Sequence, residues 1–533
     1  MKTIIATTKN KYCLLLFLCI FLSLFLLNGC DRKSEVKEEK ILKTVEVNKE
    51  EDTLFLTMVK TKDINPLTVQ EVSVDYTLKL LYEGLYGLDE NYNLVPKLAD
   101  SAVFSNANRI LKIKLKSNAK WHSGRNVTSE DVKYTVEYLK AHPESPYHYM
   151  VQNISKVSVL DTNSCTVYLV NSDPLAQYDL LFPIVKKGAG ANDPFQLDGT
   201  GKYRFDGYEA VDMIRLSANK DHYAQVPKIP NIKVRLVRDE QIRSNLFLAT
   251  DSDVIETTRE EVVLYDYDVF ESRPYPNLQY EMLIFNSSRP PFKKMKNRRA
   301  LINALDKELI SKEGYRVDKK YNGVFISQRS VLREEILLPK DTGAFHKEWE
   351  PDKVKNYQLV VDSSNPIRFA SANLIRKELK KSGIHIDVVG VSAQDAKKKL
   401  KEGNYDLALI GYKMPLKPNI MKIFNKGNIF FYDPLPLAKK FSSLLVEEDE
   451  QVFIQKYKEF QKSFVDEGFY CGFTTLDNYI VKNRRIYGEM KPNVYDIYNG
   501  IENLEIKNRF EVPMGEYDIE KDEQEGIQEH RND

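Results

Sequence analysis

Residue types that catalyse reactions or hold metals are sparse in this chain of 533 residues, which has seven histidines and five cysteines. His142 and His148 flank Pro143-Glu144-Ser145, but residues at this spacing share no helix face, and the proline breaks the interval. We expect both histidines in an exposed loop, not in a metal site. No Gly-x-Ser-x-Gly, His-Glu-x-x-His or Walker-type motif occurs, so the sequence favours a protein that is not an enzyme and has no cofactor.

Cys30 is the cysteine with a clear chemical role. A start containing three lysines precedes an apolar run from Cys13 to Leu27, whose length suits a secretory signal better than a membrane span. The run ends in Leu27-Asn28-Gly29-Cys30, which is similar to the lipobox of bacterial lipoproteins. We predict a signal peptide at residues 1–29 and a lipid on the Cys30 thiol, which would anchor the chain at the extracytoplasmic face of the membrane. The alternative is an N-terminal anchor that is never cleaved.

The remaining cysteines of the predicted mature chain, Cys165 and Cys471, lie far apart in the sequence. Either a disulfide or two buried free thiols would fit, and the sequence leaves both open.

Charged segments flank the expected folded body. Residues 30–52 are rich in Lys, Glu and Asp and predict a solvated tether, and residues 511–533 predict an acidic, disordered tail. Overall the 78 basic and 77 acidic residues nearly balance, which gives no electrostatic argument for a nucleic-acid partner. The hydrophobic fraction of 42% supplies a core, and this length predicts two or three lobes.

The body alternates strand and helix patterns, which predicts an α/β protein. Thr128 with Asp131 approximates a capping box, and His142-Pro143 should end that helix. The strands expected are 53–59, 109–116, 384–388 and 405–410, and the helices are 75–85, 128–141, 292–310, 371–382 and 392–402.

Residues 111–139, LKIKLKSNAKWHSGRNVTSEDVKYTVEYL, carry a resemblance to a known family. The Lys120-Trp121-His122-Ser123-Gly124 turn and the Thr128-Ser129-Glu130-Asp131-Val132 helix start resemble the signature of the family 5 extracellular solute-binding proteins, which serve ABC importers of oligopeptides, dipeptides and nickel. Five further stretches follow the family pattern in order: Leu81-Tyr82-Glu83-Gly84-Leu85, Val95-Pro96-Lys97-Leu98-Ala99, Gly199-Thr200-Gly201-Lys202-Tyr203, Phe285-Asn286 to Leu301, and Gly403 to Tyr412. We expect Trp121 to pack structurally and His122 not to be a metal ligand.

The resemblance implies a two-lobed periplasmic-binding-protein-like α/β fold of type II, with an extra subdomain in the first lobe and a hinge. The implied organisation is a lobe I core from 53–78, 199–275 and 478–510, an extra subdomain from 79–198, and lobe II from 276–477. Crossover segments are expected near 275–286 and 470–480. The implied protein is a monomer that binds a peptide or other small solute between closing lobes and delivers it to the permease of an ABC importer.

The resemblance also implies ligand contacts. Extended backbone before the LYEGL segment would pair with a peptide as an added strand. The other contacts would come from a Ser-Pro-Tyr stretch, from the first crossover and from the loop after the Tyr-Asp strand. The implied ligand-binding residues are Val72, Ser73, Val74, Tyr147, Tyr275, Gly411, Tyr412, Lys413 and Met414, and no metal ligand is implied.

Four positions depart from the peptide-binding pattern. The aspartate that holds a ligand α-amino group in relatives corresponds to Pro415, another acidic position to Ile284, and two arginines to Leu400 and Leu409. Either Lys413, Asp63 or Glu281 takes over, or the ligand is not a zwitterionic peptide. An alternative function is a surface receptor or signal-peptide sensor that keeps the fold without transport.

Overall fold

The computed structural model describes residues 42–62, 64–189, 197–318, 331–334, 336, 341–350, 356–418 and 435–513. The described residues fall into two units, one that holds residues 42–45 and 511–513 at the chain ends and one within residues 46–510. In the terminal unit, β1 (Leu42–Glu46) pairs with β20 (Arg509–Pro513). β1 lies inside the segment for which the composition predicts a solvated tether. The rest of that segment up to residue 41, including Cys30, and the tail from residue 514 lie outside the described residues.

A four-stranded sheet begins the larger unit. Its first strand coincides with the strand predicted at Thr53–Val59, which confirms that prediction. β2 runs parallel to β11, and β11, β10 and β9 are antiparallel. The order is β2 (Thr53–Val59), β11 (Asn231–Val237), β10 (Met213–Ala218) and β9 (Tyr203–Ala210).

The helix that packs against β2 differs from the prediction. α2 runs from Val72 to Leu78, because the side chain of Glu71 caps its N-terminus by accepting a hydrogen bond from Ser73. After Leu78 the backbone carbonyls of Leu80 and Leu81 accept hydrogen bonds from the amides of Tyr203 and Gly201. These carbonyls are therefore bound by another segment, and the predicted continuation to Leu85 is wrong.

A second sheet, of four antiparallel strands, carries helix α3. The helix starts at a capping box of Thr128 and Asp131 and ends at His142, as predicted. The elements are β5 (Ala99–Ser105), β6 (Ile110–Leu115), β8 (Ser164–Leu169), β7 (Ile154–Asp161), α3 (Ser129–Ala141), the β3 (Tyr86–Leu88) and β4 (Leu94–Pro96) pair, and the short helices η1 (His148–Val151) and η2 (Ala176–Leu180).

The third sheet has six strands in the order β12, β17, β13, β16, β14, β15. The strands are β12 (Val254–Thr258), β17 (Tyr470–Asn483), β13 (Phe270–Phe285), β16 (Leu407–Lys413), β14 (Tyr357–Asp362) and β15 (Ile386–Val391). The helices around this sheet are α5 (Met295–Ala304), α6 (Lys307–Leu309), η4 (Ile310–Gly314), α7 (Thr342–Glu348), α8 (Pro366–Lys381) and α9 (Ala393–Glu402). The predicted helix at 292–310 is thus broken after Ala304. The helix predicted from Ser371 begins at Pro366 instead, because Asn365 caps it.

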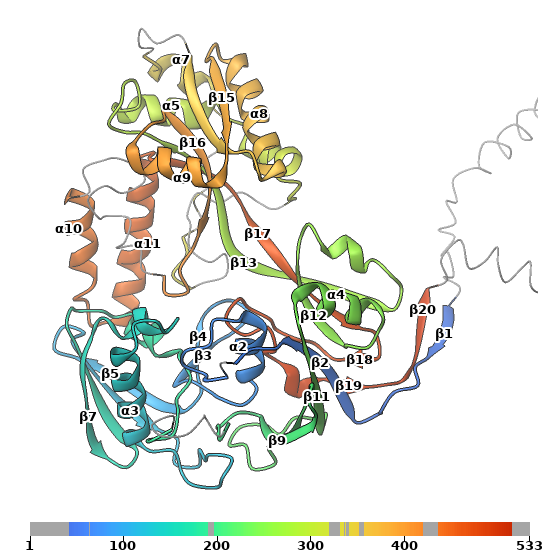
Figure 1. The fold of residues 1–533 in the computed structure, drawn as a ribbon. Helices are drawn as coiled ribbons and strands as arrows, with labels where there is room; N and C mark the ends of the chain where they lie inside the picture. The colour runs from blue at the N-terminus through green and yellow to red at the C-terminus, as the bar shows by residue number, and fades with distance from the viewer. Residues whose placement is uncertain are drawn as a thin grey trace, which may run out of the picture. The chain divides into compact units, whose positions relative to one another are not determined.

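The long strands β13 and β17 lie side by side in antiparallel pairing from Phe270↔Asn483 to Ile284↔Tyr470 (Figure 1). They fall on the two segments expected as crossovers. Their pairing is interrupted between Pro276 and Tyr280, and beyond this break β13 also pairs with β16.

The remaining elements complete the larger unit. They are α4 (Glu240–Leu248), η3 (Val262–Tyr265), α10 (Leu435–Leu444), α11 (Glu450–Asp466), β18 (Ile486–Tyr487), η6 (Ile501–Asn503) and β19 (Glu505–Ile506). The architecture is a two-lobed α/β fold, as expected.

A fully buried ion pair ties the start of this unit to its end. Arg485, just after β17, donates to both carboxylate oxygens of Asp253 at 2.8 and 2.6 Å, and neither side chain is exposed. The same guanidinium donates to the carbonyl of Thr53 at 2.9 Å, and Asp253 accepts from the amide of Phe55 at 2.7 Å. One pair therefore fixes β2 against β12 and β17.

Candidate functional site

A cavity of about 200 Å³ opens beside α2. Its walls come from four stretches of the chain that are distant in sequence. Most of the lining side chains are apolar or tyrosine, and the charged ones are Asp75 and Lys79. The lining residues are Val69, Gln70, Val72, Asp75, Lys79, Pro146, Tyr147, Tyr149, Met150, Leu416, Val494 and Tyr495.

The charged pair in this cavity is internally neutral. Asp75 and Lys79 are four residues apart at α2, so they share a face and form an ion pair. The Tyr147 hydroxyl donates to the other oxygen of Asp75 at 2.7 Å, and the Lys79 ammonium lies 4.6 Å from the ring centroid of Tyr495. Burial, with the nearby Asp75 carboxylate, raises the pKa of Tyr147 well above its ordinary value, so its hydroxyl stays protonated. The wall thus offers hydrogen-bonding groups and aromatic faces without a net charge.

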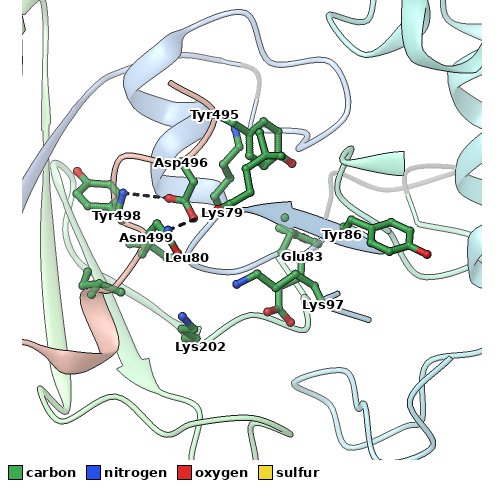
Figure 2. A pocket seen from close by; sticks show the side chains of 15 residues that line it. Lys79, Leu80, Glu83, Tyr86, Lys97, Lys202, Tyr495, Asp496, Tyr498 and Asn499 are labelled. Carbon is green, nitrogen blue, oxygen red and sulfur yellow. Dashed lines mark hydrogen bonds between the residues drawn. The ribbon is translucent and has the colours of Figure 1, made fainter. Parts of the chain in front are cut away.

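A smaller cavity of about 50 Å³ shares Lys79 and Tyr495 with the first (Figure 2). Lys97, Lys202 and Asp496 also line it. Burial raises the pKa of Asp496, against the effect of the nearby lysines, and its carboxylate accepts a hydrogen bond from the amide of Tyr498 at 3.0 Å. This volume holds a few water molecules at most and is too small for a solute. We regard it as a polar support behind the larger cavity.

Of the three residues predicted before the LYEGL segment, only Val72 lines the larger cavity. The backbone at Val72–Val74 is helical, not extended, so it cannot add a peptide as a strand; that expectation is wrong. The Ser73 hydroxyl accepts from the Val59 amide at 2.9 Å, and Val74 is fully buried. Both side chains hold α2 against β2.

Tyr147 lines the cavity, whereas Tyr275 is placed elsewhere. Tyr275 is buried in β13, and its hydroxyl donates to the carboxylate of Glu256. Its predicted contact with ligand is therefore not supported by its position.

The predicted residues Gly411, Tyr412, Lys413 and Met414 also lie off the cavity wall, which Leu416 reaches instead. Gly411 pairs with Glu281 across β16 and β13. Met414 is buried, and its amide donates to the Leu278 carbonyl at 2.8 Å.

Glu281 is not free to replace the missing amine anchor. It is 1% exposed and accepts two hydrogen bonds from the guanidinium of Arg368, at 2.9 and 2.8 Å, and one from Gln279 at 2.8 Å. A Cβ on Gly411 would collide with this pair, which explains the glycine there. Lys413 is exposed on β16, and Asp63 lies outside the described residues.

Comparison with known proteins identifies the family. The model of the bacterial extracellular solute-binding proteins, family 5 (middle part), matches residues 93–425. The chain belongs to this family.

Individual members of family 5 are distant in sequence. The glutathione-binding protein GsiB of Escherichia coli is 21% identical over 351 residues, which cover 62% of this chain and 66% of that protein, so less than two thirds of the relative's length is matched.

Solved structures share the fold. The ABC transporter substrate-binding protein CtaP from Listeria monocytogenes is 19% identical, with a TM-score of 0.70 over 86% of this chain and all of that chain. The unliganded open form of the periplasmic murein tripeptide-binding protein MppA is 17% identical, with a TM-score of 0.74 over 87% of this chain and 98% of that chain.

The family 5 signature around Trp121 has a structural role here, as expected. Trp121 is buried and its indole N–H donates to Asp131 at 3.3 Å. The same carboxylate accepts from Thr128, Arg125 and the amide of Lys187. This turn is thereby locked onto the start of α3.

The histidines near this turn also have structural roles. The ring of His122 bonds the Gly201 carbonyl and the Gly199 amide. His142 and His148 were expected to be exposed, but both are half-buried with ring nitrogens on the carbonyls of Tyr138 and Leu139 in α3. These two histidines thus bind backbone carbonyls in the last turn of α3, where such groups lack partners within the helix.

Within the described ranges, no group of three or more His, Cys, Asp or Glu side chains could hold a metal ion. Among the same residues, no helix is long and apolar enough to cross a membrane. Cys165 and Cys471 are both buried free thiols, which decides the question that the sequence left open. Burial raises the pKa of Cys165 to about 12 and that of Cys471 to about 11, so both remain unreactive thiols.

Proposed function

We propose that this chain is the lipid-anchored, extracytoplasmic binding component of an ABC importer and takes peptides into the cavity beside α2. The observation that carries the proposal is the cavity itself, which is lined by α2, the Tyr147 segment, Leu416 and Val494–Tyr495. Segments this far apart in sequence meet there without forming a catalytic arrangement.

The chemistry of the wall supports a peptide as ligand. A peptide presents apolar side chains together with neutral amide donors and acceptors, and the cavity offers valine, methionine and tyrosine surfaces beside Asp75, Lys79 and Gln70. GsiB is named for glutathione and MppA for a murein tripeptide, which is consistent with this class.

A second function is favoured by one observation. The buried Glu281 is already paired with Arg368, and Pro415, Ile284, Leu400 and Leu409 carry no charge, so the charged ends of a zwitterionic peptide have no evident partners at these positions. This supports a receptor or sensor of a signal peptide that does not transport.

Native mass spectrometry of the purified chain tests peptide binding. We expect co-purified masses of short peptides from the wild type. Val72→Trp fills the cavity and should remove these masses. Val103→Trp changes another exposed valine, on β5 and away from the cavity lining, so it is the matched control and should keep them. Wild-type protein without any bound mass, and without affinity for a peptide library, would reject peptide binding.

The lipid anchor needs its own test. Cells fed radiolabelled palmitate should label the wild-type chain and leave Cys30→Ser unlabelled. Equal labelling of both would show that Cys30 is not the modified residue. Peptide uptake by cells with and without the permease of the importer separates transport from sensing. Uptake that is lost with the permease supports the importer, because only the importer function needs that permease.

A further inference from the structure

Lys417 lies between two acidic side chains from a distant part of the chain. It follows β16, and its ammonium forms ion pairs with both Asp173 and Asp179. Asp173 and Asp179 are 4% and 8% exposed, so the positive charge is held in a largely dehydrated place. The partners lie 244 and 238 residues earlier in the sequence. This cluster therefore connects the segment after β16 to the segment that contains η2.

One of the two aspartates, Asp173, is itself held in place by the backbone. The second oxygen of Asp173 accepts from the Leu175 amide at 3.0 Å, and the Asp173 amide donates to the Asn108 carbonyl at 3.1 Å. The Asn108 side chain in turn donates to the carbonyls of Leu445 and Glu447, at 3.1 and 2.6 Å, just after α10. The contacts of Asn108 with Leu445 and Glu447, like the Lys417 cluster, therefore connect Asp173 and its neighbours to residues that follow β16.

The segment that carries Lys417 is also fixed on its far side. Tyr457, fully buried in α11, donates a hydrogen bond to the carbonyl of Pro418. On the near side, the amide of Met414 donates to Leu278. Residues 414–418 are therefore attached at both ends and in the middle.

This segment forms part of the cavity wall. Leu416, next to Lys417 in the chain, lines the cavity, and so does Tyr149, whose pKa is raised to about 12 by burial and by the nearby Asp179. The ion cluster and the ligand cavity are therefore adjacent. Freeing Leu416 would pull the Lys417 ammonium away from the two carboxylates and break two ion pairs of largely buried groups.

On the basis of the proposed function, we propose that Lys417 determines ligand length: held by Asp173 and Asp179, it fixes Leu416 as an end wall and restricts the cavity to short peptides. The volume of about 200 Å³ is below the roughly 300–1,000 Å³ of ordinary small-molecule sites, which favours a short ligand. A longer peptide has to displace Leu416 and therefore has to break the cluster.

The test replaces the whole cluster. Lys417→Met alone takes one cation away from two buried carboxylates and can prevent folding, so the informative variant combines Asp173→Asn, Lys417→Met and Asp179→Asn. This triple variant keeps the side-chain sizes and removes the charges. Lys462→Met, at an exposed lysine of α11, is the matched control for loss of one lysine.

Calorimetric titration with a series from dipeptides to nonapeptides measures the length preference. We expect the triple variant to gain affinity for the longer peptides by at least about tenfold relative to the short ones, while Lys462→Met keeps the wild-type profile. An unchanged length profile in the triple variant overturns the proposal.

Hydrogen exchange of the ligand-free full-length chain gives a readout that does not depend on peptide binding. The amides of Met414 and Asp173 should exchange faster in the triple variant than in the wild type and in Lys462→Met. If the wild type binds no peptide of any length, the proposed function fails, and exchange alone decides whether the cluster holds the segment. Unchanged exchange in the triple variant would refute the clamp.

Discussion

The hydroxyl of Tyr147 donates a hydrogen bond of 2.7 Å to Asp75, and so joins the segment after α3 to helix α2 at the cavity wall. The same carboxylate binds Lys79, which makes Asp75 the junction of the two segments.

Tyr147→Phe removes the hydrogen bond to Asp75 and the longer one, 3.4 Å, that the Lys79 ammonium donates to the hydroxyl, and leaves the ring in place. We expect the free energy of unfolding to fall by about 1–2 kcal/mol. Urea denaturation measures this change. Tyr208→Phe, at an exposed tyrosine of β9, is the control and should shift stability by less than about 0.5 kcal/mol. Equal stability of wild type and Tyr147→Phe would show that these bonds contribute nothing net.

The buried Arg485–Asp253 pair gives a larger effect. Arg485→Met removes the close cation from Asp253, which keeps the Phe55 amide and the more distant Lys49 ammonium at 3.4 Å, and should reduce the free energy of unfolding by about 3–5 kcal/mol. Arg484→Met, at the half-buried neighbour that donates to the Asp268 carbonyl, should cost about 1 kcal/mol or less. If urea denaturation shows that both variants lose a similar free energy of unfolding, burial of the Arg485–Asp253 pair does not account for the effect.

Gly199 packs so closely on the turn after α2 that a Cβ would overlap the carbonyl oxygen of Leu81. Gly199→Ala should therefore destabilise the chain by about 1–3 kcal/mol, since a backbone carbonyl cannot move aside as a flexible side chain can. Gly343→Ala, on α7, meets only the Asp341 carboxylate at 3.3 Å and should be neutral or stabilising. Thermal unfolding of the two variants compares them directly, and equal melting temperatures would speak against tight packing at Gly199.

Asp496 should make stability depend on pH. Burial raises its pKa in the folded chain, so the fold favours the protonated carboxyl. Its contribution is fully present below the unfolded pKa of about 3.9 and is lost as pH rises through the raised folded pKa. Asp496→Asn imitates the protonated form, so the variant should melt higher than wild type at neutral pH and equally near pH 3.

The control for Asp496 is Asp212→Asn, at an exposed aspartate between β9 and β10, which should show no such pH-dependent difference. A lower melting temperature of Asp496→Asn than of wild type at neutral pH would mean that the attraction of the Asp496 carboxylate to Lys97 and Lys202 outweighs the cost of burying its charge.

Motifs in the sequence predicted the family and the two-lobed fold, and local rules predicted the capping box of Thr128 and Asp131. Helix periodicity failed at Leu80–Leu85, because those leucines are buried in a turn whose carbonyls bind Gly201 and Tyr203. No local pattern in the sequence predicts such a long-range hydrogen bond.

The candidate site was predicted only in part, for a similar reason. Tyr147 was found through its Ser-Pro-Tyr context, and Val72 through its position before the LYEGL segment. Leu416, Val494 and Tyr495 carry no motif, and only the fold brings them to the cavity. The Lys417 cluster likewise could not be predicted from the sequence, because its two aspartates lie more than two hundred residues before Lys417.

The contacts of Arg485 also set an order on folding. Its guanidinium binds the carbonyl of Thr53, at the very first strand of the larger unit. During synthesis, which starts at the N-terminus, β2 therefore lacks its contact with Arg485 until residue 485 has been made. Contacts so distant in sequence slow folding and leave the early segments exposed for longer. A chain cut short before Arg485 would lose the support of its first strand as well as its own end.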